Sequence, residues 1–506
     1  MEIIELKKVD DVHMKVKCSK SVFAEMRDFF TFEVETARFS PAYRNKKWDG
    51  KIRLLNGLTK QIYIGLFNRV MKWAKGNDYK LVFGNDLKYW EKRWHGDNIT
   101  QFNPTSKGKI ITPHDYQINA VNKALNFKRL IIESPTSSGK SLIIYSIIRH
   151  MQNMFSDNIL LIVPTTSLVL QMLNDFKDYS SQEDWDVDDN CHIIYAGKEK
   201  ESQQQIFIST WQSLYDMDEE YFSKFNGVIV DEGHLAAAKS IKTIMENLKN
   251  CPYKISTTGT LHEEELKMNR FSLEGLFGTV HTTTTTKELM DSGKVSKLNI
   301  QCVKLNYTDK EKEFFKPKTI VKSGKRKRKA VNYKDEIDFI IGHDKRNEFI
   351  MNLANSCKGN VLVLFAFKEK HANIFYEKIK DEISNRDIFF VHGDVPTEER
   401  ESIRDGIQNS NNCIVMATYG TFKMGINIPN LQYLIFAHPY KGKIINLQSI
   451  GRVLRLDKRT NKATLIDLID DLRWKKQENY TYIHGIKRLE LYNKEKFDFN
   501  IRSKSL

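Results

Sequence analysis

The segment Leu130–Ser141 contains the residue types that bind a nucleotide phosphate. It reads as a short apolar strand, a loop of small residues, and an amphipathic helix from about Gly139 to Phe155. Gly139 lets the backbone approach an anion, and the N–H groups at the helix start point toward it. Lys140 can reach the β- and γ-phosphates, and the hydroxyl of Ser141 can ligate Mg²⁺. The segment therefore predicts a loop that binds ATP and Mg²⁺.

The loop departs from the usual pattern at one position. Ser134 stands where G-x-x-x-x-G-K-[ST] has its first glycine. Read alone, the stretch is also compatible with an ordinary helix N-cap and a solvated lysine. Upstream, Gln117 carries an amide that can make two complementary hydrogen bonds to adenine. We therefore predict a nucleotide site made of Gln117, Ser134, Pro135, Thr136, Ser137, Ser138, Gly139, Lys140 and Ser141.

Two adjacent carboxylates follow a second apolar run. Asp231 and Glu232 come directly after Gly227–Val230, which we expect to be a buried strand that ends at the ligand-binding edge of a parallel sheet. Asp231 would hold the Mg²⁺ bound at Ser141, and Glu232 would orient and deprotonate the attacking water. Many Asp-Glu pairs only cap helices, but the apolar run and the spacing from Lys140 favour a catalytic pair.

Two arginines lie three residues apart in a later helical segment. Arg452 and Arg455 would share one face of that helix. Two guanidinium groups aimed at a γ-phosphate can act as arginine fingers, each worth about 10³ or more in rate in related systems. A surface arginine pair is the plain alternative, and the accompanying Gln448 and Gly451 disfavour it. After another strand, we expect further contacts at the cleft between lobes from Gly425 and Asn427.

Hydroxyl groups follow several apolar runs, where a strand would end. At the start of a helix, such groups can hold a phosphate of a nucleic-acid backbone. Thr165 and Thr166 follow Ile159–Val163 and could equally serve only as N-cap residues. The same arrangement recurs along the chain at Thr210 with Trp211, and at Thr418.

The N-terminal hundred residues carry cations beside aromatic rings. Lys46, Lys47 and Trp48 lie next to the turn signal Asp49-Gly50, which we expect to join two strands. Cations for phosphates and rings for stacking are the composition of a nucleic-acid surface. Trp48 could equally be a core anchor, with the lysines merely solvated.

Length and charge limit the class of protein. A chain of 506 residues predicts about three domains, and a formal charge of +15 suggests a polyanionic partner. The six cysteines contain no Cys-x-x-Cys pair, which disfavours a zinc site and a disulfide framework. No apolar run is long enough to span a membrane, and the N-terminus has no signal-peptide pattern. The cationic run Lys322–Lys329 is interpreted as a flexible loop that can rest on phosphates, or simply as a solvated loop.

Strands and helices alternate over most of the chain, which predicts an α/β fold with two parallel sheets in tandem. In the first hundred residues, short apolar strands flank helical runs, which predicts a small α+β domain. We expect a basic nucleic-acid-binding domain at 1–100, an ATP-binding lobe at 101–290, a second lobe at 291–475 and a basic helical segment at 476–506.

In their order, these motifs resemble the superfamily 2 helicases of the DExH type. The phosphate loop, Asp-Glu-Gly-His at 231–234, Ser-Thr-Thr-Gly-Thr at 256–260 and Gln-Ser-Ile-Gly-Arg-Val-Leu-Arg at 448–455 carry the likeness. Within that superfamily, segments such as Trp48–Leu55 and Leu468–Asp471 resemble the phage recombination-repair helicases. The resemblance implies two RecA-like lobes. Asn427 departs from the pattern where many relatives carry Asp.

The resemblance also implies a function. It indicates an ATP- and Mg²⁺-dependent motor that acts on branched DNA and on RNA–DNA hybrids, regressing forks, migrating Holliday junctions and unwinding R-loops. A monomer in the host cytoplasm, without a membrane partner, is the corresponding expectation. A duplex translocase of the restriction type, an RNA helicase and a non-enzymatic annealing protein are the rival hypotheses.

Overall fold

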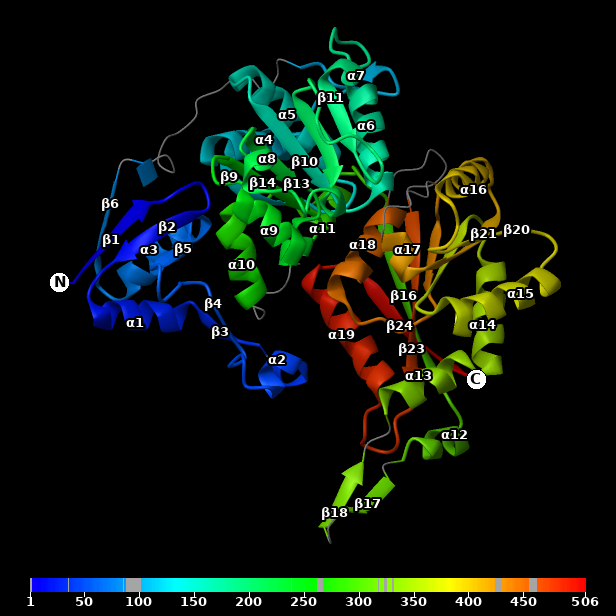
Figure 1. Ribbon diagram of the computed structural model, residues 1–506. Helices are drawn as coiled ribbons and strands as arrows, with labels where there is room; N and C mark the ends of the chain where they lie inside the picture. The colour runs from blue at the N-terminus through cyan, green and yellow to red at the C-terminus, as the bar shows by residue number, and fades with distance from the viewer. Residues whose placement is uncertain are drawn as a thin grey trace. The chain divides into compact units, whose positions relative to one another are not determined.

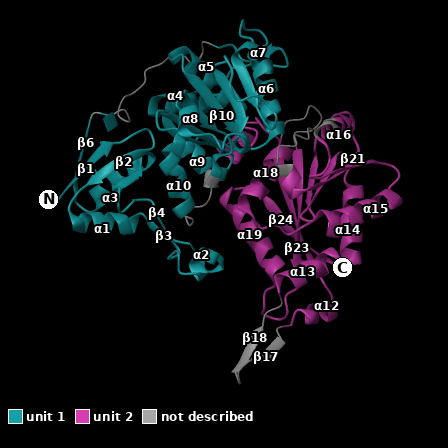
Figure 2. Ribbon diagram, in the orientation of Figure 1, with its two compact units in different colours: residues 1–135, 139–284 teal, residues 136–138, 285–506 magenta. Residues whose placement is uncertain are grey.

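The structure is a computed structural model. It describes residues 2–34, 36–84, 86–87, 102–237, 239–261, 267–316, 318–322, 325–329, 332–423, 430–454 and 462–506. They form two compact units (Figure 2), one of Met1–Pro135 with Gly139–Thr284 and one of Thr136–Ser138 with Thr285–Leu506. Among the described residues, no helix has the length and apolar content needed to cross a membrane.

A small mixed sheet with the strand order β5-β2-β1-β6 begins the first unit. Alternate residues of its central strands are buried, which is the pattern of a sheet covered on one face. Val22 and Met26 of α1 and Val70 and Ala74 of α3 join the same core. The elements are β1 (Ile3–Lys8), β2 (His13–Lys17), α1 (Lys20–Phe29), β3 (Thr31–Glu33), α2 (Pro41–Arg44), β4 (Lys51–Arg53), β5 (Gln61–Tyr63), η2 (Ile64–Leu66), α3 (Phe67–Gly76) and β6 (Lys80–Phe83).

The larger sheet of the first unit has seven strands, all parallel, in the order β11-β12-β10-β13-β14-β9-β15. Its strands β10, β13, β14 and β9 are labelled in Figure 1. Its inner strands are continuous apolar runs, because helices cover both faces of a parallel sheet. Its elements are α4 (Asp115–Phe127), β9 (Arg129–Glu133), α5 (Lys140–Met154), β10 (Asn158–Val163), α6 (Thr166–Tyr179), β11 (Cys191–Ile194), β12 (Ile206–Thr210), η5 (Trp211–Ser213), β13 (Phe225–Val230), η6 (Gly233–Ala237), α9 (Lys239–Asn247), β14 (Tyr253–Thr258), α10 (Lys267–Phe277) and β15 (Thr279–Thr282).

The small sheet and the larger sheet of the first unit share one hydrophobic core, which runs from Ile4 to Phe277. At their seam, the Arg69 guanidinium holds the Glu274 carboxylate with two hydrogen bonds of 2.7 and 2.8 Å. A Cβ atom on Gly65 would overlap the backbone carbonyl of Glu274, so the two parts are in close contact there. The small sheet is therefore built onto the larger one and is not a loosely tethered module.

The second unit contains another seven-stranded sheet, again all parallel, in the order β20-β21-β19-β22-β23-β16-β24. Its elements are α11 (Thr286–Asp291), β16 (Lys297–Asn306), α12 (Asp309–Phe314), β17 (Lys318–Lys322), β18 (Lys325–Lys329), α13 (Tyr333–Ile341), α14 (Asp344–Ser356), β19 (Val361–Phe365), α15 (Asn373–Glu382), β20 (Asp387–Val391), α16 (Thr397–Asn409), β21 (Cys413–Thr418), α17 (Tyr419–Lys423), β22 (Tyr433–Phe436), α18 (Lys443–Val453), β23 (Lys462–Asp471), α19 (Tyr480–Lys494) and β24 (Phe499–Ser505). The predicted fold class is confirmed.

Three local predictions differ from the structure. The cationic run Lys322–Lys329 includes a strand, β18, which pairs antiparallel with β17, where a flexible loop was expected. The C-terminal segment adds β24 to the second sheet besides the expected helix. This edge strand pairs with β16, and nearly all its residues are exposed, so its sequence lacks the pattern of a half-buried strand. The turn at Asp49-Gly50 follows the short helix α2 instead of a strand.

Candidate functional site

The predicted phosphate loop connects β9 to α5, as its sequence indicates. Gly139 is the N-cap of α5 with φ of +79°, in the left-handed region that favours glycine. Ser134, at the position of the missing glycine, is fully buried, and its hydroxyl accepts a 2.8 Å hydrogen bond from Thr283. Its backbone N–H donates to the carbonyl of Thr258. The serine therefore anchors the start of the loop to the end of β14.

The two residues expected to contact phosphates and Mg²⁺ lie at the start of α5. The ammonium group of Lys140 donates to the backbone carbonyl of Ser134, 3.3 Å away across the loop. The hydroxyl of Ser141 lies 2.7 Å from the phenolic oxygen of Tyr179, at the end of α6. Tyr179 had no signal in the sequence, because its partner is 38 residues distant.

Gln117, the predicted adenine contact, lies beside the loop. It is the third residue of α4 and is buried. Its side-chain oxygen accepts a 2.7 Å hydrogen bond from the backbone N–H of His114, which caps the helix. A Cβ atom on Gly139 would collide with its side-chain nitrogen, so the amide reaches the phosphate loop. Nothing in the sequence pattern indicates this capping role.

The predicted carboxylate pair follows β13, next to the phosphate loop in the same sheet edge. The Thr257 hydroxyl donates a 2.7 Å hydrogen bond to Asp231, whose backbone N–H donates to the carbonyl of Ile162. Burial, together with the neighbouring Glu232 carboxylate, raises the pKa of Asp231, while Lys140 opposes the rise. Asp231 therefore follows a strand of the same sheet that carries the phosphate loop.

Glu232 is held by β14 in an uncommon backbone conformation. Its φ is +51°, and its carboxylate lies 3.1 Å from Nδ1 of His234. That ring nitrogen is also 3.0 Å from the Thr258 hydroxyl. A Cβ atom on Gly233 would overlap the hydroxyl of Ser256, so only glycine fits against β14 here. The segment Asp231–His234, called the carboxylate segment below, therefore packs closely against β14.

Glu133, at the end of β9, is a further residue of this site, and no sequence motif points to it. Its carboxylate accepts a 3.2 Å hydrogen bond from the backbone N–H of Leu261 and a 2.9 Å bond from the Thr282 hydroxyl. It thereby ties the strand before the phosphate loop to β15 and to the segment that follows β14.

The donor set fits a hard cation. Ser141 and Asp231 offer a hydroxyl and a carboxylate, and Mg²⁺ is usually held by one or two such groups plus substrate phosphates. Among the residues that the structure describes, no cluster of three His, Cys, Asp or Glu side chains could hold a metal by itself.

A pocket of about 520 Å³ lies at the ends of β10, β11 and β12 and brings together three of the predicted nucleic-acid contacts. Thr165, Thr166 and Thr210 all line it, together with the loop cations Lys198 and Lys200. Thr165 also caps α6, accepting a hydrogen bond from Leu168. The two lysines were not singled out in the sequence.

The other predicted nucleic-acid contacts have different surroundings. Trp211 is half-buried and packs against the core of the first unit. Thr418, in the second unit, pairs its hydroxyl with that of Thr421 at 2.7 Å. Lys46 and Lys47 are exposed after α2, whereas Trp48 is half-buried and its indole N–H donates to the carbonyl of Lys51. The indole is thus partly committed to holding its own turn.

The second unit carries the predicted arginine segment. Arg452 lies in the last turn of α18, in which Gln448 and Gly451 are buried. The remaining predicted residues lie outside the described residues, and these are Arg455, Gly425 and Asn427.

Three family models match successive parts of the chain. The model described as DNA helicase UvsW, N-terminal, matches residues 3–84. The model for the res subunit of type III restriction enzymes matches residues 110–263, and the helicase conserved C-terminal domain matches residues 344–457. The small sheet, the first parallel sheet and much of the second are thus each similar to a known family.

Individual proteins extend the likeness to the whole chain. The ATP-dependent DNA helicase UvsW of Enterobacteria phage T4 is 34% identical over 519 aligned residues, covering 98% of each chain. The DNA 3'-5' translocase XPB2 of Sulfurisphaera tokodaii is 24% identical and covers 72% of this chain and 83% of its own length.

Solved structures agree with these matches. The crystal structure of T4 UvsW superposes with a TM-score of 0.51 at 32% identity, covering 99% of both chains. The yeast protein Dbp5, bound to RNA and ADP BeF3, shares only the fold, with a TM-score of 0.52 at 14% identity over 78% of this chain and 90% of its own. With one-third identity along nearly its full length, this chain belongs to the UvsW-type superfamily 2 helicases and is an ATP-dependent DNA helicase.

Proposed function

We propose that this helicase acts on branched DNA, regressing forks, migrating Holliday junctions and unwinding R-loops in phage recombination, repair and replication. Its likeness to T4 UvsW, including the N-terminal family match at residues 3–84, supports this assignment. The formal charge of +15 fits a polyanionic substrate. Branched DNA and RNA–DNA hybrids are the proposed substrates, and a monomer is the proposed active form.

The proposed ATP site is built on the phosphate loop. Lys140 binds the β- and γ-phosphates, the backbone from Ser134 to Gly139 surrounds them, and Gln117 reads the adenine. Ser141 and Asp231 hold Mg²⁺, which would neutralise phosphate charge when bound. Glu232 orients and deprotonates the attacking water. From the second unit, the γ-phosphate and ribose would be contacted by Arg452, Arg455, Gly425 and Asn427.

One observation carries the proposal that hydrolysis is coupled to movement on DNA. Thr258 accepts a backbone hydrogen bond from Ser134 of the phosphate loop, and its hydroxyl lies 3.0 Å from His234. His234 in turn lies 3.1 Å from the Glu232 carboxylate. A change at the γ-phosphate would therefore have a short path of contacts into β14 and the strands beside it.

The proposed nucleic-acid path in the first unit crosses the pocket at Thr165, Thr166 and Thr210, with Trp211 at its margin. Hydroxyls and lysines there suit phosphates and carry no sequence information, so binding would be largely independent of sequence. Thr418 in the second unit and Lys46, Lys47 and Trp48 in the N-terminal part are the further proposed contacts.

The decisive test is a panel of forked DNA, four-way junction, R-loop, RNA duplex and plain duplex, with and without ATP. Wild-type protein should unwind the branched substrates and the R-loop only with ATP, and Lys140→Ala should abolish unwinding while DNA binding persists. Translocation on plain duplex without strand separation would instead support the rival of a restriction-type motor. Preference for the RNA duplex would point to an RNA helicase.

A further inference from the structure

Four successive backbone carbonyls after β22 are each held by a side chain from elsewhere in the second unit. They belong to Ala437, His438, Pro439 and Tyr440, the residues that lead from β22 toward α18. Loop carbonyls ordinarily bond to water or to their own backbone. Four successive carbonyls that each accept a hydrogen bond from a side chain therefore hold this segment in one conformation.

The donors to the first two carbonyls come from α14 and α17. The guanidinium of Arg346 donates to the carbonyl of Ala437 at 2.9 Å. The phenol of Tyr419 donates to the carbonyl of His438 at 3.2 Å. Both donors are buried.

The donors to the last two carbonyls come mainly from the C-terminal helix α19. Nδ1 of His484 lies 3.2 Å from the carbonyl of Pro439, and because a carbonyl only accepts, that nitrogen carries the proton. Arg488 donates to the carbonyl of Tyr440 at 3.3 Å, and the amide of Asn446 on α18 donates to the same oxygen at 3.1 Å.

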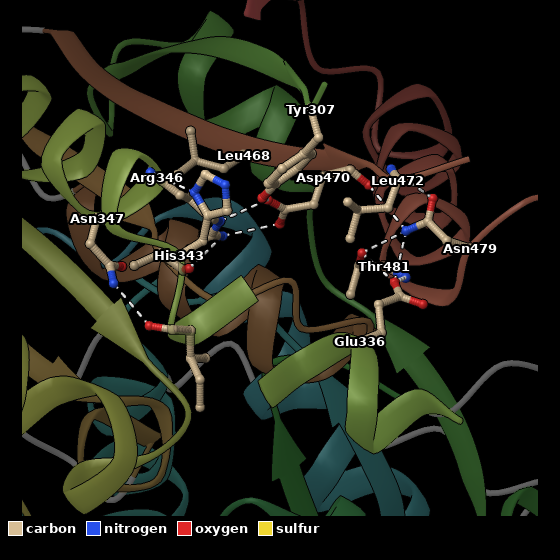
Figure 3. Close-up of polar contacts among 12 residues, drawn as sticks. Tyr307, Glu336, His343, Arg346, Asn347, Leu468, Asp470, Leu472, Asn479 and Thr481 are labelled. Atoms are coloured by element: carbon tan, nitrogen blue, oxygen red, sulfur yellow. Dashed lines mark hydrogen bonds and ion pairs between the residues drawn. The ribbon is translucent and has the colours of Figure 1, made fainter. Parts of the chain in front are cut away.

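Two aspartates on β23 hold the two arginines in place. Arg346 is fully buried and bonds to the Asp470 carboxylate at 2.7 and 3.0 Å (Figure 3). Arg488 is equally buried and bonds to Asp467 at 3.0 and 2.9 Å. Asp467 and Asp470 are three apart on one strand and so face opposite sides of the sheet. The segment is therefore fixed from both faces.

A guanidinium suits this task because it is planar and directs several N–H groups at fixed angles. Burial opposes its charge, but the Asp467 carboxylate raises the pKa of Arg488, which stays charged. The same balance, with Asp470, raises the pKa of Arg346. Buried ion pairs add little net stability, and in some proteins they fix the position of the groups that they join. In this unit, the two ion pairs fix the guanidinium groups that hold the residues just before α18.

We infer that Arg488 and His484 of the C-terminal helix, with Arg346 of α14, are positioning residues for ATP hydrolysis, because they set the origin of the helix that carries Arg452. Arg452 lies nine residues after Lys443, the first residue of α18, which is about 13.5 Å along the helix axis. A change in the orientation of residues 437–440 is therefore magnified at Arg452. A displacement of about 1 Å in an active site can lower a rate by about 10²-fold. This inference rests on the proposed role of Arg452.

The test compares Arg488→Met with Lys487→Met, a matched control that removes an exposed cation from the neighbouring position of the same helix. For Arg488→Met, kcat for DNA-stimulated ATP hydrolysis should fall about 10- to 100-fold, with ADP affinity unchanged because the phosphate loop is intact. Affinity for ADP with aluminium fluoride should fall by a similar factor. Lys487→Met should match wild type.

A double variant separates positioning from general damage. Once Arg452→Ala has removed the guanidinium, adding Arg488→Met should lower kcat no further, because residues that act through one group are non-additive. Independent, multiplying losses would overturn the inference, as would wild-type kcat in a folded Arg488→Met protein.

If Arg488→Met fails to fold, His484→Phe provides the test of the inference. Burial lowers the pKa of His484 to about 4, so the ring is neutral. Its removal therefore leaves no buried charge without a partner. It should lower kcat several-fold with ADP binding intact, and unchanged kcat would overturn the inference. If Arg452→Ala itself hydrolyses ATP normally, the proposed role of Arg452 is wrong, whatever the α19 variants do.

Discussion

The hydroxyl of Thr257 donates a 2.7 Å hydrogen bond to the carboxylate of Asp231, which joins the strand β14 to the proposed Mg²⁺ ligand. Hydrogen bonds of this kind orient a ligand before the metal arrives. Replacing Thr257 with an isosteric side chain that lacks the hydroxyl should therefore weaken Mg²⁺ binding without unfolding the protein.

Thr257→Val tests that relationship. We expect the Mg²⁺ concentration for half-maximal ATP hydrolysis to rise about 10-fold, because the carboxylate loses the partner that fixes it. Mg²⁺ titrations of the hydrolysis rate measure this. Thr464→Val, on β23 of the second sheet, is the matched control and should leave the titration unchanged. An unaltered Mg²⁺ requirement in Thr257→Val would show that the bond does not orient the ligand.

Gly233→Ala tests the interlock between the carboxylate segment and β14. The added Cβ would overlap the Ser256 hydroxyl, so we expect a loss of about 1–3 kcal/mol in stability and a lower hydrolysis rate. Thermal unfolding and steady-state hydrolysis measure the two effects. Adding Ser256→Gly should restore part of the stability, since it removes the colliding atoms. If the double variant is as unstable as the single one, steric overlap is not the cause.

Lys198 and Lys200 test the pocket at the ends of β10, β11 and β12. If each contacts a DNA phosphate, Lys→Gln at either position should reduce the log–log salt slope of duplex binding by about 1, roughly equally for all sequences. Fluorescence anisotropy at several salt concentrations gives the slope. Lys378→Gln, on the exposed face of α15, serves as the control. Slopes equal to wild type in both pocket variants would remove this pocket from the DNA path.

Acid should destabilise the second unit through its buried histidines. Burial and the nearby Arg346 lower the pKa of His438 to about 3, against the opposite effect of Asp470. Burial lowers the pKa of His484 to about 4, with Lys441 and Arg488 adding to the effect. Both rings are neutral in the fold but bind protons in the unfolded chain below about pH 6.5.

Stability from these rings is therefore full above about pH 6.5 and declines as the pH falls toward 4. The unfolding temperature should drop between pH 7 and pH 5, by about 2–4 °C for each kcal/mol lost. Differential scanning calorimetry measures the drop. His484→Phe should show a shallower decline than wild type. A flat profile for wild type would mean that these rings are protonated without cost in the fold.

The sequence by itself determined the parts of the site that are contiguous. The loop ending at Lys140 and the pair Asp231–Glu232 each follow one apolar strand, and a strand delivers its last residues to a known edge of a parallel sheet. The alternation of strands and helices likewise determined the fold class. These features depend on spacing along the chain, which is visible in one dimension.

Only the tertiary structure decided how those parts support one another. Glu133 meets Thr282 across 149 residues, and Arg346 meets Asp470 across 124. Nothing in a linear pattern pairs such residues, because their contact depends on strand order and on which helix covers which face. The edge strand β24 was missed for a related reason, since its exposed polar side chains lack the buried pattern that identifies a strand.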